Sequence, residues 1–284
     1  MRVSYYPGCS LHGTAREYDE STKAICALLD IELKELKDWS CCGASAAHSS
    51  DKFLSIALPA RNLAIAEKEN EEDLVIPCAA CYQRLKMAEK ELLGNPQPIV
   101  DVDYKGKLKI THLLDFLYDS ALFQKIAAKI KRPLTCLKTV CYYGCLTMRP
   151  PKITDAKDYE DPQKMDELMM VLGAENLFWS YKTDCCGGSL VLTRPDIVRK
   201  LCGKLLEMAK EAGAEALITA CPLCQGNLDT RQREISEELG KDYYLPIFYF
   251  TELIGLALGH PEFTKWLGRH LVDPGKLLVS KGLL

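Results

Sequence analysis

The sequence lacks the features that define several large classes of protein. It has no basic excess, because 36 Lys and Arg residues stand against 39 Asp and Glu residues for a net charge of −3, and this argues against a nucleic-acid binder. Its longest apolar stretch, residues 245–259, contains Glu252 and is too short and too interrupted to span a bilayer. The first ten residues, MRVSYYPGCS, hold no apolar core of a signal peptide. We therefore expect a cytoplasmic protein with no membrane span and no nucleic-acid partner.

Cysteine is what the chain has in abundance, with 14 cysteines among 284 residues. Disulfide scaffolds are usually short exported chains, whereas this chain is long, 48% hydrophobic and 26% charged. That length and balance suit one large globular domain or two medium ones. At this density, the cysteines of a chain that is not exported more often hold metal or perform redox chemistry.

The cysteines belong to an internal repeat. The adjacent pair Cys41-Cys42 recurs as Cys185-Cys186, and a C-x-x-C motif follows after 35 residues in the first copy and 34 in the second. A Gly-Cys step precedes each pair, and residues 111–114 resemble residues 251–254. Such self-similarity predicts two modules, residues 1–130 and residues 131–284, the second ending in a C-terminal tail. The longer first gap of the second copy is assigned to a polar, proline-bearing loop at residues 149–162.

Strand-like and helix-like segments alternate in both modules. Short strands that end at cysteine-bearing turns are predicted at residues 2–6, 74–77, 137–143 and 216–219, and helical apolar spacing occurs at 52–71 and 195–212. Pro59 would kink the first of these helices or mark its start. The alternation predicts an α/β fold, with two similar modules of parallel sheets flanked by helices and related by a pseudo-twofold axis. Ligands of such sheets bind beyond the carboxyl ends of the strands, where the cysteines fall.

Each module offers five thiols in the pattern Cys-x(31–39)-Cys-Cys-x(34–35)-Cys-x-x-Cys. Structural zinc takes four ligands and simple iron–sulfur clusters take four thiolates, so five is one more than either needs. The surplus favours an iron–sulfur cluster with one thiolate in an unusual role, and zinc or buried reduced thiols are the alternatives. Gly8, Gly43, Gly144 and Gly187 adjoin these cysteines, where glycine lets the backbone come close and frees N–H groups to bond sulfur.

The double motif resembles the tandem CCG domain, and the arrangement of two modules without fused partners resembles the B-type subunit of the heterodisulfide reductase family. This resemblance covers nearly the whole chain. The gap between Cys186 and Cys221 is one residue shorter than the family pattern, which we interpret as a shortened loop with the site retained. The resemblance implies two noncubane [4Fe-4S] clusters, whose ten ligands would be Cys9, Cys41, Cys42, Cys78, Cys81, Cys145, Cys185, Cys186, Cys221 and Cys224.

The resemblance also implies an activity. The chain would be a catalytic subunit that reduces the mixed disulfide of coenzyme M and coenzyme B to two thiols, by reductive S–S cleavage between the clusters, with no catalytic residue beyond the cluster ligands. Electrons would come from a small cubane-cluster subunit and a flavin-containing subunit, with a hydrogenase or formate dehydrogenase acting through the latter. The second hypothesis is a CCG-type electron-transfer subunit of a quinone-, lactate-, glycolate- or succinate-linked oxidoreductase. The third is a thiol or zinc scaffold that binds a partner.

Four further cysteines lie outside the double motif. Cys26 and Cys202 fall in helix-like apolar runs, where a free cysteine is a common small core residue. Cys136 and Cys141 lie near the strand that leads to the second module. Cys141 is aligned with Ser4 of the first module, and we expect its neighbour at position 145 to be the ligand instead.

Two histidines and two cations are candidates by position. His12 follows the first cysteine of its module, but Met148 stands at the matching place in the second module, so a shared ligand role is not expected; hydrogen bonding, substrate contact and a plain surface histidine stay open. His48 is unassigned. An anionic disulfide would need cations nearby, and Arg149 and Lys152 are candidates, although solvated loop charges are the preferred interpretation.

Overall fold

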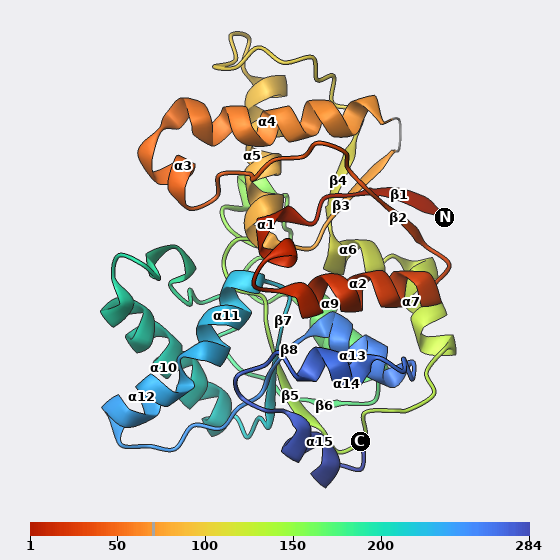
Figure 1. Ribbon diagram of the computed structural model, residues 1–284, viewed down its shortest axis with the longest axis vertical. Helices are drawn as coiled ribbons and strands as arrows, with labels where there is room; N and C mark the ends of the chain where they lie inside the picture. Colours follow the sequence, from red (N-terminus) through yellow and green to blue (C-terminus); the bar gives the residue numbers. More distant parts are fainter. Residues whose placement is uncertain (70–71) are drawn as a thin grey trace.

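Two four-stranded parallel sheets form the centre of the protein in a computed structural model, which describes residues 1–69 and 72–284 (Figure 1). The strand order is β2-β1-β3-β4 in the first sheet and β6-β5-β7-β8 in the second, with parallel pairing throughout. The predicted α/β class with parallel sheets is confirmed. The strands are β1 (Arg2–Tyr5), β2 (Glu32–Glu35), β3 (Asp73–Ile76), β4 (Lys109–His112), β5 (Lys138–Tyr142), β6 (Glu175–Asn176), β7 (Ala216–Thr219) and β8 (Ile247–Tyr249).

Helices connect the strands and cover the sheets. The predicted helix at 52–71 is observed as α4, which contains Pro59; residues 70 and 71 lie outside the described residues. The helices that accompany the first sheet are α1 (Gly8–His12), α2 (Arg16–Leu28), α3 (Ala46–Ser50), α4 (Lys52–Lys68), α5 (Ala79–Gly94), α6 (Leu113–Leu117) and α7 (Ser120–Ala128).

The second sheet has a matching set of helices and a helical tail. The predicted helix at 195–212 is observed as α10. The segment 149–162, predicted as a loop, contains a short helix, α8, that packs on the first module: the Tyr82 hydroxyl donates to the carbonyl oxygen of Thr154 at 2.8 Å. The helices are α8 (Pro151–Thr154), α9 (Lys164–Val171), α10 (Pro195–Glu211), α11 (Pro222–Thr230), α12 (Gln232–Leu239), α13 (Phe250–Ala257), α14 (Phe263–Leu267) and α15 (Gly275–Ser280), with a 3-10 turn at Gly188–Leu190.

The strand registers correct two details of the predicted repeat alignment. Tyr5 pairs with Val75 in the first sheet, and Cys141 pairs with Ile218 in the second. Because Val75 and Ile218 each lie three residues before a C-x-x-C motif, the counterpart of Cys141 is Tyr5, and the predicted match with Ser4 is wrong. Strand register follows from which face of the strand is buried and from the turns around it, and a match between short stretches of sequence does not define it.

The second correction concerns the last strand of each sheet. His112 pairs with Ile76 and Tyr249 pairs with Thr219, so His112 and Tyr249 occupy matching places. The predicted match of residues 111–114 with residues 251–254 is therefore displaced by three positions. A similarity between two four-residue segments can arise by chance, whereas the hydrogen bonds between neighbouring strands pair each residue with one partner.

The two modules share a core. The Tyr18 ring of α2 stacks on Tyr249, with centroids 4.1 Å apart and planes at 4°. Its hydroxyl lies 3.2 Å from the carbonyl oxygen of Pro77 and 3.3 Å from that of Ala220, two residues that hold matching places before the C-x-x-C motifs. The boundary at residue 130 falls between α7 and β5, and it stays a prediction, because one apolar core cluster joins residues of both modules.

The C-terminal tail is attached to the second module by a buried ion pair. His270 Nε2 lies 2.9 Å from Glu252 Oε1, and both side chains are fully buried. Asp229 accepts backbone hydrogen bonds from Leu271 and Val272 at 2.7 and 3.1 Å. Glu17, from the first module, is buried beside this group. The tail is thus part of the folded core.

Candidate metal centres between the two modules

The cysteines gather at the carboxyl ends of the central strands, as the sequence predicts. Cys9 follows β1, and Cys78 follows β3 as the N-cap residue of α5. Cys145 and Cys221 take the same places after β5 and β7 in the second module, where Cys221 caps α11. In each sheet the order of strand addition reverses between these two strands, so both sites lie at a topological switch point, the usual binding crevice of an open parallel sheet.

In the first module the five sulfurs form a chain of neighbours. The Cys41 Sγ atom lies 3.7 Å from the Cys9 Sγ atom, and the Cys42 Sγ atom lies 3.3 Å from the Cys81 Sγ atom. The side chain of Cys42 also contacts Cys41, and Cys78 contacts Cys81. Residues from three separate segments thereby meet around one point.

The second module repeats this arrangement. The Cys186 and Cys224 Sγ atoms are 3.5 Å apart, the side chain of Cys145 contacts Cys185, and Cys221 contacts Cys224. The accessible members of this group lie at the Gly-Cys step and in the adjacent pair: Cys185 is exposed and Cys145 is partly buried. All ten predicted ligands therefore fall into two groups of five.

Contacts among the sulfurs favour the thiolate at particular positions. The contacts with Cys42 and then Cys9 lower the pKa of Cys41 to about 2. The contact with Cys145 and the Gly187 N–H lower the pKa of Cys185 to about 6. The same contacts raise the pKa of Cys9 and of Cys145. In each group the thiolate, which is the form of cysteine that ligates metals, is therefore favoured at the exposed cysteine of the adjacent pair.

Two glycines give the sulfurs room. Gly8 and Gly144 have φ angles of +74° and +68°, a conformation that glycine adopts without strain. A Cβ atom on Gly8 would lie 2.7 Å from the Cys81 Sγ atom, and one on Gly144 would lie 3.0 Å from the Cys224 Sγ atom. Side chains at these turns would collide with the sulfur groups.

Backbone N–H groups also point at the sulfurs. Gly43 donates to the Cys41 Sγ atom at 3.4 Å and Gly187 donates to the Cys185 Sγ atom at 3.2 Å. Such hydrogen bonds tune the potential of iron–sulfur centres. A donor set of thiolates alone, supported in this way, fits an iron–sulfur cluster. Among residues 1–69 and 72–284, no three or more His, Cys, Asp or Glu side chains are arranged to hold a single metal ion.

The remaining cysteines do not contribute sulfurs to the two groups, although the Cys202 Sγ atom lies 3.4 Å from the carbonyl oxygen of Cys186. Cys26 and Cys202 are buried among apolar side chains, which confirms their prediction as core residues. The Cys141 Sγ atom lies 3.2 Å from Asn176 Oδ1, and burial raises the pKa of this thiol. Cys136 is exposed.

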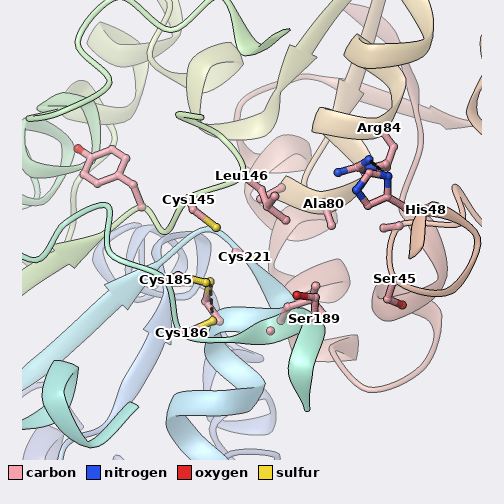
Figure 2. A pocket seen from close by; sticks show the side chains of 16 residues that line it. Ser45, His48, Ala80, Arg84, Cys145, Leu146, Cys185, Cys186, Ser189 and Cys221 are labelled. Atoms are coloured by element: carbon pink, nitrogen blue, oxygen red, sulfur yellow. Dashed lines mark hydrogen bonds between the residues drawn. The ribbon is translucent and has the colours of Figure 1, made fainter. Parts of the chain in front are cut away.

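A cavity of about 210 Å³ lies between the modules, beside the second group of sulfurs (Figure 2). Its walls are mostly apolar, with Ala80 and Leu146 among them, and all five motif cysteines of the second module line it. The first module contributes Arg84 and His48, which Figure 2 shows across the cavity from Cys145 and Cys185. Within the described part of the chain, no cysteine of the first module lines this cavity.

The polar end of the cavity was not predicted. Arg84 is 7% exposed, and its Nη1 donates to His48 Nδ1 at 2.6 Å, so the unassigned His48 has a place in the site. Burial lowers the pKa of Arg84, and burial together with the neighbouring guanidinium lowers the pKa of His48. The sequence did contain an indication that Arg84 belongs to the site, because this residue follows the second cysteine of its C-x-x-C motif by three residues, on the same face of the helix.

The candidates proposed by position lie elsewhere. Arg149 and Lys152 are exposed and do not line the cavity; Arg149 Nη2 donates to Thr183 at 2.9 Å. Both are exposed charges, as the preferred interpretation predicted, although Lys152 lies in the short helix α8 rather than in a loop. His12 is exposed, and its Nε2 lies 3.0 Å from a carboxylate oxygen of Glu35.

Sequence comparison identifies the class of protein. The profile of the CCG cysteine-rich domain family matches residues 3–86 and again residues 139–229, so the chain belongs to that family and contains two copies of its domain. No helix in the described part of the chain is long and apolar enough to cross a membrane.

Relatives extend over both copies. The chain is 31% identical, over 96% of its length and 98% of the relative's, to the 8-methylmenaquinol:fumarate reductase membrane anchor subunit of Wolinella succinogenes. It is 30% identical, over 91% of its length and 89% of the relative's, to the B-type subunit of the ferredoxin:CoB-CoM heterodisulfide reductase of Methanosarcina mazei. A crystal structure of a hypothetical protein from Helicobacter pylori shares the fold, with a TM-score of 0.76 and 13% identity over 96% of this chain and 52% of that one.

Proposed function

We propose that this chain is the catalytic subunit of a heterodisulfide reductase, which reduces the coenzyme M–coenzyme B mixed disulfide to two thiols. The observation that carries this proposal is the cavity between the modules, because a small molecule bound there would lie against the accessible sulfurs Cys145 and Cys185. A centre that only relays electrons needs no such cavity. Relatives named as B-type subunits of heterodisulfide reductases support the proposal.

Two noncubane [4Fe-4S] clusters are the proposed cofactors, each held by one group of five cysteines. When bound, such clusters supply the two electrons that cleavage of an S–S bond requires. The chain's own contribution is positional. Buried thiols would hold each cluster from the side of the protein interior, and the Gly43 and Gly187 N–H groups bond the sulfurs. Apolar walls formed by Ala80 and Leu146 would keep water from the cavity.

Partner subunits belong to the same proposal. A small cubane-cluster subunit and a flavin-containing subunit would deliver electrons in the cytoplasm, with a hydrogenase or formate dehydrogenase acting through the flavin subunit. Relatives named as subunits of heterodisulfide reductases, from Methanosarcina mazei and Methanosarcina barkeri, support membership of a complex.

A second function is favoured by a different observation. The relative from Wolinella succinogenes, whose name describes a methylmenaquinol:fumarate reductase, matches nearly the whole chain at 31% identity. In that case the chain would transfer electrons in a quinone-linked oxidoreductase, and the cavity would receive the quinone head group.

Turnover separates the two functions. The anaerobically purified complex is expected to reduce the mixed disulfide and to leave menaquinone analogues unchanged. Quinone reduction without disulfide reduction would establish the second function instead. Iron and acid-labile sulfide should reach about four atoms of each per module, whereas zinc without sulfide would contradict both.

A matched pair of variants tests the ligand assignment. Cys145→Ser should lose most of the iron of the second module, because it removes one of the five sulfurs that converge there. Cys141→Ser should keep its iron, because that side chain bonds Asn176 instead. Iron and sulfide are measured per chain after anaerobic reconstitution; equal loss in the two variants would contradict the assignment.

A further inference from the structure

The Arg84 side chain is a buried cation without a carboxylate partner, and the Cys42 thiol is the acidic group that acts on it electrostatically. Its Nη1 bonds His48 Nδ1 at 2.6 Å, its Nη2 bonds Gln83 Oε1 at 2.5 Å, and the Met87 sulfur lies 3.8 Å from Nη1. In the part of the chain that the structure describes, no carboxylate forms an ion pair with this guanidinium, which is 7% exposed. Burying a charge without a counter-charge is costly, so an anion is expected to complete the site.

The protonation of His48 follows from the same contact. A guanidinium can only donate hydrogen bonds, so the Nδ1 atom of His48 must accept. The ring is therefore neutral with its proton on Nε2, in agreement with its lowered pKa. Arg84 and His48 together present a cation and an N–H donor at one end of the cavity, and the sulfurs of the second module form the other end.

The repeat shows that this pair is not part of the duplicated scaffold. Asn227 holds the place of Arg84 in the second module, three residues after Cys224, and it donates to the carbonyl oxygen of Cys186 at 3.2 Å. Leu192 holds the place of His48, six residues after the adjacent cysteine pair, and is 92% exposed. Both positions differ between the copies, and both of the first module's residues face the cavity beside the second group of sulfurs.

We propose that Arg84, with the Nε2–H of His48 beside it, binds the acidic group of a small thiol or disulfide, a sulfonate or a carboxylate, and directs its sulfur toward Cys145 and Cys185. This assignment rests on the proposed function for the identity of the sulfur compound. A guanidinium fork matches the oxygens of such a group. The apolar walls between the two ends suit a short hydrocarbon linker.

Equilibrium binding to the anaerobically reconstituted full-length chain tests the assignment without turnover. Three thiols of similar size are compared by calorimetry: 2-mercaptoethanesulfonate, the neutral 2-mercaptoethanol and the cationic 2-mercaptoethylamine. The sulfonate is expected to bind about 10- to 100-fold more tightly than the alcohol, the range that a hydrogen-bonded charge pair provides. The amine should bind most weakly.

Variants assign the preference to the residue. Arg84→Gln and Arg84→Asn, the latter copying the second module, should abolish the preference for the sulfonate, and Arg84→Lys should restore part of it. Arg61→Gln is the matched control, because this arginine of the same module pairs with Asp38 and lies outside the cavity. If Arg84→Gln fails to fold, Arg84→Lys and His48→Gln carry the test through the same ratio of affinities.

Distinct results overturn the proposal. A sulfonate preference that survives Arg84→Gln would exclude this residue as the anion site. If Arg84→Gln leaves the sulfonate preference unchanged and shifts the reduction potential of the first module's centre, Arg84 balances the thiolate of Cys42 and is likewise excluded as the anion site. Binding of a quinone analogue that depends on Arg84, with no discrimination among the thiols, would also refute it. A sulfonate preference without disulfide turnover would keep the anion site and refute the reductase function.

Discussion

Replacing Gly8 with alanine tests whether the turn after β1 exists to bring the backbone against a metal centre. The residue has a φ of +74°, and an added Cβ would lie 2.7 Å from the Cys81 Sγ atom. The left-handed conformation costs a residue other than glycine about 1–2 kcal/mol. Overpacking a filled site costs about a further 1–3 kcal/mol. We expect Gly8→Ala to lower the free energy of unfolding by about 2–5 kcal/mol, the sum of these two costs.

Gly240→Ala separates the two contributions. Gly240 has a φ of +63°, and nothing lies within 4 Å of the position of its Cβ. It therefore carries only the backbone cost of about 1–2 kcal/mol. The difference between the two variants isolates the collision with the sulfur of Cys81.

Both variants are compared by urea denaturation of the metal-free chain under anaerobic conditions, and by iron and sulfide content after reconstitution. Gly240→Ala should bind as much iron as the wild type. Gly8→Ala should lose the iron of the first module, which is about half of the total. Equal stability and equal iron content in the two variants would refute the reasoning. Gly144→Ala should reproduce the loss in the second module, where the added Cβ would lie 3.0 Å from the Cys224 Sγ atom.

Two further predictions concern the packing between and beside the modules. Burial raises the pKa of Glu17 from 4.5 to about 7. In His270, burial lowers the pKa, but the carboxylates of Glu252, Asp229 and Glu17 together outweigh burial and raise the pKa from 6.5 to about 9. Both groups bind protons more tightly in the folded state, so their stabilisation is complete below the pKa of the unfolded state and is lost as pH rises through the pKa of the folded state. Urea titrations should show the free energy of unfolding falling toward pH 9, and falling less steeply in Glu17→Gln and His270→Gln. A flat wild-type profile would contradict this. Gly255→Ala should lower stability by about 1–3 kcal/mol in thermal denaturation, because its Cβ would lie 2.5 Å from Trp266 Cζ3, and an unchanged melting temperature would show that the Trp266 ring moves aside freely.

The spacing of the cysteines was enough to predict the repeat, and the alternation of strand-like and helix-like segments was enough to predict the parallel sheets and the position of the motif at the strand ends. Each of these depends on local pattern, because a cysteine-bearing turn that follows a short apolar strand reaches the same edge of a parallel sheet in both copies. The predicted alignment of Cys141 with Ser4 was wrong because it depends on strand register and not on local pattern. Strand register depends on which face of the strand is buried and on the turns around it, and these are decided when the strand packs beside a neighbour distant in sequence.

The sequence by itself determined the two groups of sulfur donors and the core role of Cys26 and Cys202, since these follow from the internal repeat and from apolar runs along one chain. The class of protein was implied by the resemblance of the double motif to the CCG family. Tertiary structure alone decided what faces the sulfurs. Arg84 and His48 are 36 residues apart in the chain, and they meet the cysteines of the other module only because the two modules pack against each other. A cavity between modules is made by that packing, so its charge and contents appear in no single segment.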